Sequence, residues 1–275
     1  MKTIITHFYN EEYLLPFWLK HHKKYFDHGV LIDYHSTDRS VEICREICPD
    51  WEIVTSEQEE FSAVVNDVQV SKHEKRTTLD GDWRIVLNIT EFLIGDFAYL
   101  DRHPRAASPV SGPSMVGAAN FCAYEDHMDI IIPSFAMADS PFFENVDPDP
   151  SIPLIKQRCY GVPHPEAQTV DELSNRRGRR LSNFYTPYPT GRHYCFSQHE
   201  QSEKFRILWY GYSPMTDSLR KRIMQIRDKI PRSDKDAGMG VQHFIWDAKQ
   251  VEERFKLFQK HSIDLTEIIN SYENP

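Results

Sequence analysis

The sequence predicts an α/β fold, and two observations carry this prediction. Over residues 1–90, short apolar runs alternate with segments whose apolar residues recur at helical spacing. That alternation is typical of a parallel sheet covered by helices, in which ligands bind at the carboxyl ends of the strands. From Thr216 onward the pattern is helical again. We therefore expect a sheet flanked by helices, followed by a C-terminal helical tail.

The predicted strands of the first half are short, apolar or β-branched runs. They cover Lys2 to Phe8, Gly29 to Asp33, Trp51 to Thr55 and Trp83 to Ile89. The predicted helices lie between them: one opens at Asn10 as its N-cap, one spans Arg39 to Ile47, and one spans Phe61 to Arg76.

Residues 98–211 are irregular and rich in proline, with short predicted strands separated by long loops. Long loops inside a compact domain are often functional. We expect one domain over residues 1–212, with a change of character near residue 100, and a helical segment over residues 213–275.

Composition limits the function. The chain has 275 residues and a formal net charge of -9, which argues against general nucleic-acid binding because phosphate contacts need a basic surface. No apolar run approaches the ~20 residues of a membrane helix, and no signal peptide is recognisable. Five cysteines at scattered positions argue against a disulfide framework. We expect a cytoplasmic protein, either unattached or peripheral to the inner face of the membrane.

Three segments, in this order and spacing, resemble the family 2-type GT-A glycosyltransferases. The first is ITHFYNEEYLLPFWLKHH over residues 5–22, which carries the Asn-Glu-Glu opening. The second is LIDYHSTDRSVEI over residues 31–43, close to the family pattern D-x-x-S-T-D. The third is DWRIVLNITEFL over residues 82–93, where the family has a strand ending in D-x-D-E-F-L. A looser fourth match is YGYSPMTDSLRKRI followed by GMGVQHF, in the tail.

The resemblance implies a GT-A-like mixed sheet, with a nucleotide-binding half over residues 1–100 and an acceptor-side half over residues 101–212. It also implies a hexosyltransferase activity. The donor would be a UDP-, GDP- or dTDP-sugar, and the acceptor a saccharide or a lipid-linked molecule in polysaccharide biosynthesis.

The resemblance also implies which residues hold the nucleotide. These are His7, Phe8, Tyr9, Asn10, Glu12, Asp33, Asn88 and Thr90. Asp33 would contact the base or its ribose, since a carboxylate accepts hydrogen bonds from imide or hydroxyl groups. The alternative for Asp33 is a carboxylate that caps its own loop.

The metal-binding position of the family is altered. A pair of aspartates there normally binds Mn²⁺ or Mg²⁺ across the two phosphates of the donor. This chain has Asn88-Ile89-Thr90-Glu91 instead. Three interpretations stay open: a metal-independent transferase, a weakened Mn²⁺ or Mg²⁺ site that uses Glu91, and a degenerate relative that binds nucleotide or sugar without turnover.

A metal-independent enzyme would have to stabilise the departing diphosphate with cationic side chains. The segment Asn175 to Arg180, a predicted loop, offers Arg177 and Arg180, and guanidinium groups match phosphate oxygens well. The alternative is a solvated basic loop. Two further options lie in the tail: the basic run Arg220-Lys221-Arg222, and His243, which resembles a histidine that reaches the diphosphate in some relatives.

An inverting enzyme also needs a base to deprotonate the acceptor. The candidates are Glu125 and Asp126, which follow a predicted strand, and His193, which resembles a Gly-x-His element of the family. Glu91 is the acidic candidate of the altered motif. For each of them the alternative is an ordinary loop acid or a structural histidine.

Overall fold

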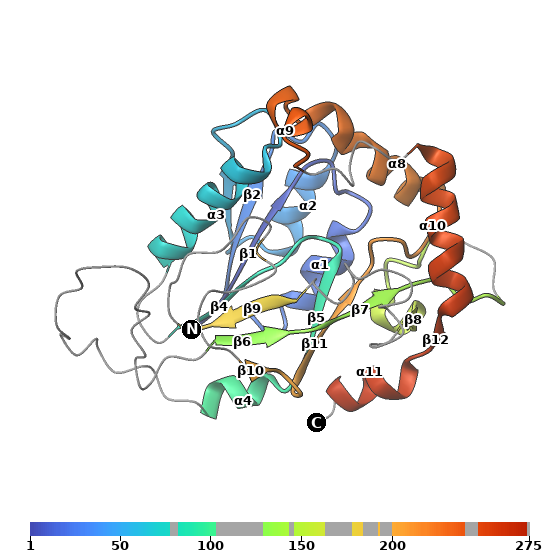
Figure 1. Ribbon diagram of the computed structural model, residues 1–275. Helices are drawn as coiled ribbons and strands as arrows, with labels where there is room; N and C mark the ends of the chain where they lie inside the picture. The colour runs from blue at the N-terminus through green and yellow to red at the C-terminus, as the bar shows by residue number, and fades with distance from the viewer. Residues whose placement is uncertain are drawn as a thin grey trace, which may run out of the picture.

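The computed structural model describes residues 1–77, 82–102, 129–142, 146–162, 178–183, 192, 200–239 and 247–273. Within these residues the strands form two sheets, and helices lie against both (Figure 1). Strands from the second half of the chain enter both sheets, so the two halves share their cores.

The larger sheet has seven strands in the order β10-β6-β9-β4-β1-β2-β3. β4, β1, β2 and β3 run parallel, whereas β9 lies antiparallel between β4 and β6. The bounds are β1 Lys2–Phe8, β2 His28–Asp33, β3 Glu52–Thr55, β4 Trp83–Val86, β6 Asp129–Ile132, β9 Arg179–Ser182 and β10 Glu200–Gln201. β1, β2 and β4 are mostly buried, as expected for parallel strands covered on both faces.

Helices cover both faces of this sheet. α1 (Leu15–His22) and α2 (Ser40–Ile47) pack on one face, in a cluster that includes Ile4 and Leu31. α3 (Ala63–Thr77) packs on the other, where its Val70 joins Ile5 and Ile32. Neighbouring residues of a strand point to opposite faces, which explains why adjacent isoleucines join different clusters.

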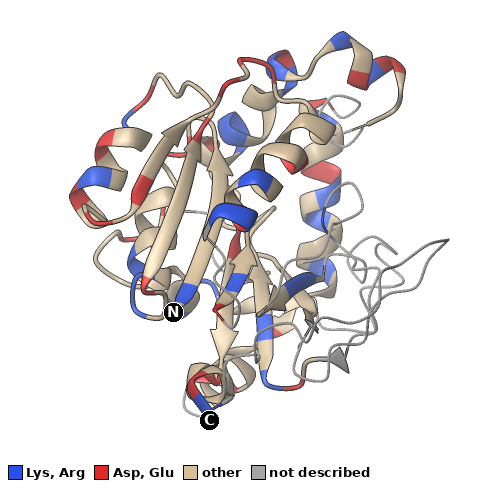
Figure 2. Cartoon of the chain, turned by 90° about the vertical axis from the view of Figure 1, so that its left-hand side faces the viewer, with Lys and Arg blue, Asp and Glu red and all other residues tan. Residues whose placement is uncertain are grey.

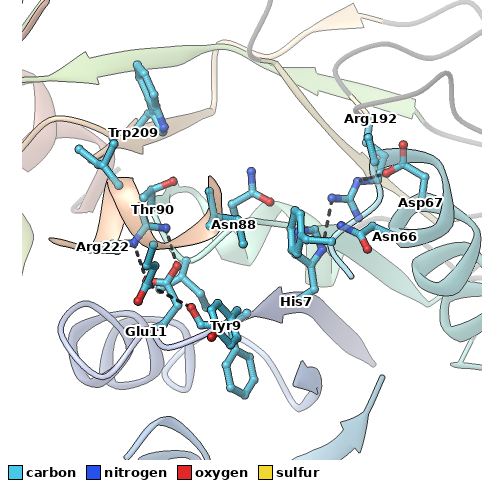
Figure 3. A pocket seen from close by; sticks show the side chains of 18 of the residues that line it. His7, Tyr9, Glu11, Asn66, Asp67, Asn88, Thr90, Arg192, Trp209 and Arg222 are labelled. Atoms are coloured by element: carbon cyan, nitrogen blue, oxygen red, sulfur yellow. Dashed lines mark hydrogen bonds and ion pairs between the residues drawn. The ribbon is translucent and has the colours of Figure 1, made fainter. Parts of the chain in front are cut away.

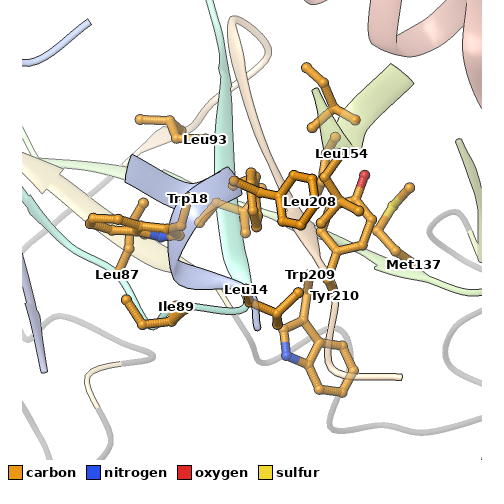
Figure 4. Packing of buried hydrophobic residues seen from close by; sticks show 14 of the residues in the cluster. Leu14, Trp18, Leu87, Ile89, Leu93, Met137, Leu154, Leu208, Trp209 and Tyr210 are labelled. Atoms are coloured by element: carbon orange, nitrogen blue, oxygen red, sulfur yellow. The ribbon is translucent and has the colours of Figure 1, made fainter. Parts of the chain in front are cut away.

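The second sheet has five strands in the order β12-β8-β7-β11-β5. Their bounds are β5 Glu91–Gly95, β7 Ser134–Met137, β8 Tyr160–Val162, β11 Phe205–Trp209 and β12 Ile263–Asp264. The short helices α4 (Phe97–Arg102) and α5 (Leu154–Gln157) accompany it. Trp18 of α1 packs among the buried residues between α1 and this sheet (Figure 4), and its indole N–H donates to the Glu91 carbonyl at 3.0 Å. This packing fixes where β4 gives way to β5.

The C-terminal part is mainly helical: α8 (Asp217–Gln225), the 3-10 helix η1 (Ile226–Lys229), α9 (Arg232–Asp236), α10 (Ala248–His261) and α11 (Thr266–Glu273). It is tied to the first half at the start of α3. The Asp234 carboxylate accepts the Ala63 N–H at 2.8 Å and the Ser62 hydroxyl at 3.3 Å. A helix begins with unpaired N–H groups, so Asp234 acts as a cap supplied from a distant part of the chain.

The predicted class, an α/β protein with a mixed sheet flanked by helices and a C-terminal helical tail, is confirmed. Two element boundaries were predicted wrongly. The first helix begins at Leu15, and Asn10 lies in a turn with φ of 50°. The strand that begins at Trp83 ends at Val86, because the chain turns there and enters the second sheet as β5.

No helix in the described part of the chain is long and apolar enough to cross a membrane. Figure 2 shows acidic and basic residues interspersed along the helices, so the net negative charge is distributed over them. Cys44, Cys48 and Cys159 are free thiols.

Candidate functional site

A cavity of about 250 Å³ lies at the carboxyl ends of β1 and β4 (Figure 3). This is the edge of a parallel sheet where ligands are expected. Five parts of the chain line it: the end of β1, the start of α3, the loop between β4 and β5, the segment after β11, and α8 with η1. Arg179 of β9 and Arg192 complete the described walls.

The first motif contributes the floor of the cavity. His7, Phe8 and Tyr9 line it, as the resemblance implies. So does Glu11, which is buried and receives two hydrogen bonds of 2.5 Å from the guanidinium of Arg222 on α8. Burial raises the pKa of Glu11 above its usual value, although Arg222 acts in the opposite direction. The tail helix is therefore fastened to the loop after β1 inside the cavity.

The second motif organises the loops behind the cavity. Asp33 accepts a hydrogen bond of 3.0 Å from the backbone N–H three residues later. Asn10 accepts the Thr37 N–H at 2.7 Å, and Glu12 accepts the Arg39 N–H at 3.2 Å. Asn10, Glu12 and Asp33 lie outside the cavity lining. The contact of Asp33 fits the loop-capping alternative, and Asn10 and Glu12 make comparable contacts with backbone N–H groups. The nucleotide-binding role of these three residues stays a prediction.

The third motif sends Asn88 and Thr90 to the cavity wall. Glu91 does not line the cavity, and only 1% of its side chain is exposed. Arg179 donates to it twice, from Nε to Oε2 at 2.8 Å and from Nη2 to Oε1 at 2.7 Å. The Asn88 backbone N–H donates to Oε2 at 2.7 Å. Both carboxylate oxygens are thus engaged by protein donors.

These contacts do not fit a divalent ion. Mn²⁺ and Mg²⁺ need oxygen ligands that face an open position, whereas the oxygens of Glu91 face a guanidinium. Within the described ranges, no three His, Cys, Asp or Glu side chains are grouped as metal ligands. In this structure Glu91 anchors Arg179, and its role as a metal ligand or a catalytic acid stays a prediction.

The predicted basic loop is in part a buried strand. Arg179 and Arg180 begin β9, and each is 2% exposed. Their side chains point to opposite faces of the sheet because they are neighbours in a strand. Arg179 reaches the cavity, whereas Arg180 is not part of its lining. The diphosphate role of Arg180 stays a prediction, and Arg179 is the neighbouring arginine that lines this cavity.

All three arginines of the described lining have a carboxylate partner. Besides the Glu91–Arg179 and Glu11–Arg222 pairs, Arg192 Nε lies 3.1 Å from an oxygen of Asp67. Three guanidinium groups are thus held in place and balanced in charge. Arg179 also donates from Nη1 to the Arg192 carbonyl at 3.3 Å, and guanidinium groups in a cavity wall match phosphate oxygens in geometry and charge.

Trp209, Gly211 and Tyr212 also line the cavity, and Figure 3 shows Trp209 and His7 on opposite sides of it. The Trp209 indole packs directly on Gly211: a Cβ atom at Gly211 would lie 2.1 Å from the ring. Tyr212 meets the Trp209 ring edge to face at 5.5 Å between centroids. Fixed aromatic faces of this kind can pack against sugar rings.

Five predicted residues lie outside the described residues: Glu125, Asp126, Arg177, His193 and His243. Conversely, the cavity contains residues that sequence reasoning missed. Glu11 differs from Glu12 only by its place in the motif, and Arg222 was one of three basic candidates. Arg179 belongs to the basic segment Asn175 to Arg180, in which Arg177 and Arg180 were preferred. For the others no sequence signal was available: Asn66, Asp67, Arg192 and Trp209.

Comparison with known proteins gives little beyond this geometry. No family model matches the chain, and no curated protein matches it. Among solved structures, S. aureus TarS 1–349 is 10% identical, covers 94% of this chain and 71% of its own, and has a TM-score of 0.38. A 4-diphosphocytidyl-2C-methyl-D-erythritol synthase is 12% identical and has a TM-score of 0.28; the match covers 55% of this chain and 68% of the synthase chain. Similarity this low leaves the activity of the chain open.

Proposed function

We propose that this chain is a glycosyltransferase that takes a sugar from a nucleotide-diphosphate donor bound in this cavity. The supporting observation is that residues of two separate motifs line the same cavity. Five residues that the motifs assign to the nucleotide come from segments about eighty positions apart and line one cavity at the carboxyl ends of parallel strands. They are His7, Phe8, Tyr9, Asn88 and Thr90.

The diphosphate is stabilised by arginines in this proposal. Transfer of the sugar leaves negative charge on the diphosphate, and prepositioned donors lower the energy of that state without reorganising. Arg179 is prepositioned by its two hydrogen bonds to Glu91, and Arg222 by its two to Glu11. Neither Mn²⁺ nor Mg²⁺ takes part.

The acceptor is a saccharide or a lipid-linked molecule, as the resemblance implies. Glu125, Asp126 and His193 stay the candidates for the base that deprotonates it.

Calorimetric titration with UDP, GDP and dTDP tests the proposal. We expect at least one of them to bind, and Thr90→Val, which removes a hydroxyl from the wall at nearly constant volume, to weaken that binding. Ser262→Ala, which removes a hydroxyl outside the lining, serves as the control. Absence of binding by all three nucleotides would overturn the proposal.

A second candidate is a protein that binds a nucleotide or sugar without turnover. The Glu91–Arg179 pair favours it, because the last acid of the altered motif is committed to a structural contact. Incubation with UDP- and GDP-sugars distinguishes the two. Release of nucleotide that Thr90→Val slows supports the transferase, whereas binding without release supports the second candidate.

A further inference from the structure

The carboxamide of Asn66 is buried without a partner. Asn66 lies in the second turn of α3 and is 2% exposed. Its Oδ1 atom accepts no hydrogen bond, and none is made by its side-chain N–H groups within the described part of the chain. A buried amide in this state costs free energy, so native proteins rarely keep one without a reason.

The Asn66 side chain belongs to the cavity. It lines the same space as His7 and Phe61, and Figure 3 places it beside His7 and Asp67, at the end opposite Trp209. An amide offers an acceptor and a donor side by side. The Oδ1 atom is closed off from the cavity, so a ligand that enters this end meets the side-chain N–H groups of Asn66 and can accept a hydrogen bond from them.

The surroundings indicate a flat, polar ring. His7 and Phe61 meet edge to face with centroids 5.2 Å apart, and Tyr34 packs behind them at 6.0 Å from His7 and 5.2 Å from Phe61. On the other side Arg192 is fixed by Asp67. Aromatic walls next to an unpaired amide suit a ring that has apolar faces and hydrogen-bonding edges.

We infer that the Asn66 carboxamide hydrogen-bonds to the edge of the donor's nucleobase, which lies at the His7–Phe61 end of the cavity. This inference rests on the proposed function and adds the orientation of the nucleotide-sugar donor in the cavity. The base occupies the end at α3, and the sugar points toward Trp209. Base edges carry acceptors that match the side-chain N–H groups of an amide.

Asn66→Leu tests the inference, because leucine has a similar size and no polar atoms. Its affinity is measured by calorimetry for UDP, GDP and dTDP, and for inorganic diphosphate, which lacks a base. We expect wild type to bind one nucleotide more tightly than diphosphate. We expect Asn66→Leu to lose roughly tenfold in affinity for that nucleotide and to keep its affinity for diphosphate.

Stability provides a second readout. Removing an unpartnered buried amide should leave the melting temperature of the ligand-free protein unchanged or raise it, whereas removing a structural amide would lower it. Thr3→Val is the matched control. The Thr3 hydroxyl is also buried without a partner, but it lies outside the cavity lining. Thr3→Val should behave like Asn66→Leu in melting and like wild type in binding.

The outcomes are distinct. Equal nucleotide affinity in wild type and Asn66→Leu overturns the inference, as does an equal loss for nucleotide and diphosphate. Asn66→Ala repeats the measurement with a smaller side chain and a good helix former, should leucine prevent folding. Ribose 5-phosphate is titrated as well, and a loss of its affinity equal to that of the nucleotide would move the contact to the ribose and overturn the base assignment. Failure of wild type to bind any nucleotide overturns the proposed function itself.

Discussion

Arg179 and Glu91 form a two-fold hydrogen-bonded ion pair in the interior, with 3% and 1% of their side chains exposed. The pair joins the first strand of the second sheet to the antiparallel strand of the first.

Loss of this ion pair should account for most of the loss of stability when Glu91 is replaced. Glu91→Gln leaves Arg179 buried without its counter-charge, so we expect the free energy of unfolding to fall by about 3–5 kcal/mol. Urea denaturation measures it. Glu57→Gln is the control: Glu57 pairs with Lys72 on the surface, where such pairs contribute about 0–1 kcal/mol. Similar losses in the two variants would contradict a special role for the buried pair.

Metal removal should have little effect. Because the oxygens of Glu91 face Arg179, we expect the affinity for the nucleotide in EDTA to stay within about twofold of its value with Mn²⁺. Parallel calorimetric titrations make the comparison. A large loss in EDTA that returns with Mn²⁺ would restore an ion to the mechanism.

The position of the Trp209 ring can be changed without substituting Trp209. Gly211→Ala places a methyl group against the ring, so we expect weaker binding of a nucleotide-sugar than of the bare nucleotide diphosphate, measured by calorimetry. Gly29→Ala is a matched control. A Cβ there would lie 2.1 Å from the Trp51 ring, away from the cavity. It should lower stability and leave binding unchanged, and equal binding losses would argue against a sugar platform.

The contribution of Asn10 to stability should depend on its backbone conformation as well as on its side chain. Asn10 has φ of 50° and accepts the Thr37 N–H. Asn10→Gly loses the hydrogen bond but adopts this φ readily, whereas Asn10→Ala loses the bond and is strained. We expect alanine to lower the free energy of unfolding by about 1 kcal/mol more than glycine does. Equal values in urea denaturation would contradict this account.

Two buried histidines predict how stability depends on pH. Burial lowers the pKa of His21 from 6.5 to about 4 and holds that of His22 well below 6.5. As pH falls below 6.5 the unfolded chain binds protons that the folded chain does not, so the free energy of unfolding decreases toward pH 4. His21→Gln removes one such site.

The slope of stability against pH between 7 and 5 should therefore be shallower in His21→Gln than in wild type. Burial raises the pKa of Glu11 and of Asp139, which acts in the opposite direction, but both groups are present in both proteins. Urea denaturation at several pH values gives the slopes, and identical slopes would show that His21 does not titrate as described.

Much of the fold could be predicted because hydrophobic periodicity is a local property. β1, β2 and α3 lie close to where their patterns place them. The end of β4 could not be predicted from the sequence. Leu87 and Ile89 continue the apolar run, although the chain already turns there. What decides the turn is distant packing, including the contact between Trp18 and the Glu91 backbone.

The site was predicted in part for the same reason. His7, Tyr9 and Thr90 belong to local motifs and reach the cavity. Arg179 and Asn66 could not be selected, because an arginine in a basic run or an asparagine in a helix has no local mark of its function. Their positions follow from the pairing of β9 with β4 and from the placement of α3.

The cap on α3 has a consequence for synthesis on the ribosome. The residues joined by this contact are 171 positions apart, and the cavity wall at α8 comes from the same late part of the chain. Chains fold from the N-terminus as they emerge. The nascent protein can assemble β1 to β4 early, but the cavity is incomplete until α8 and Asp234 have emerged.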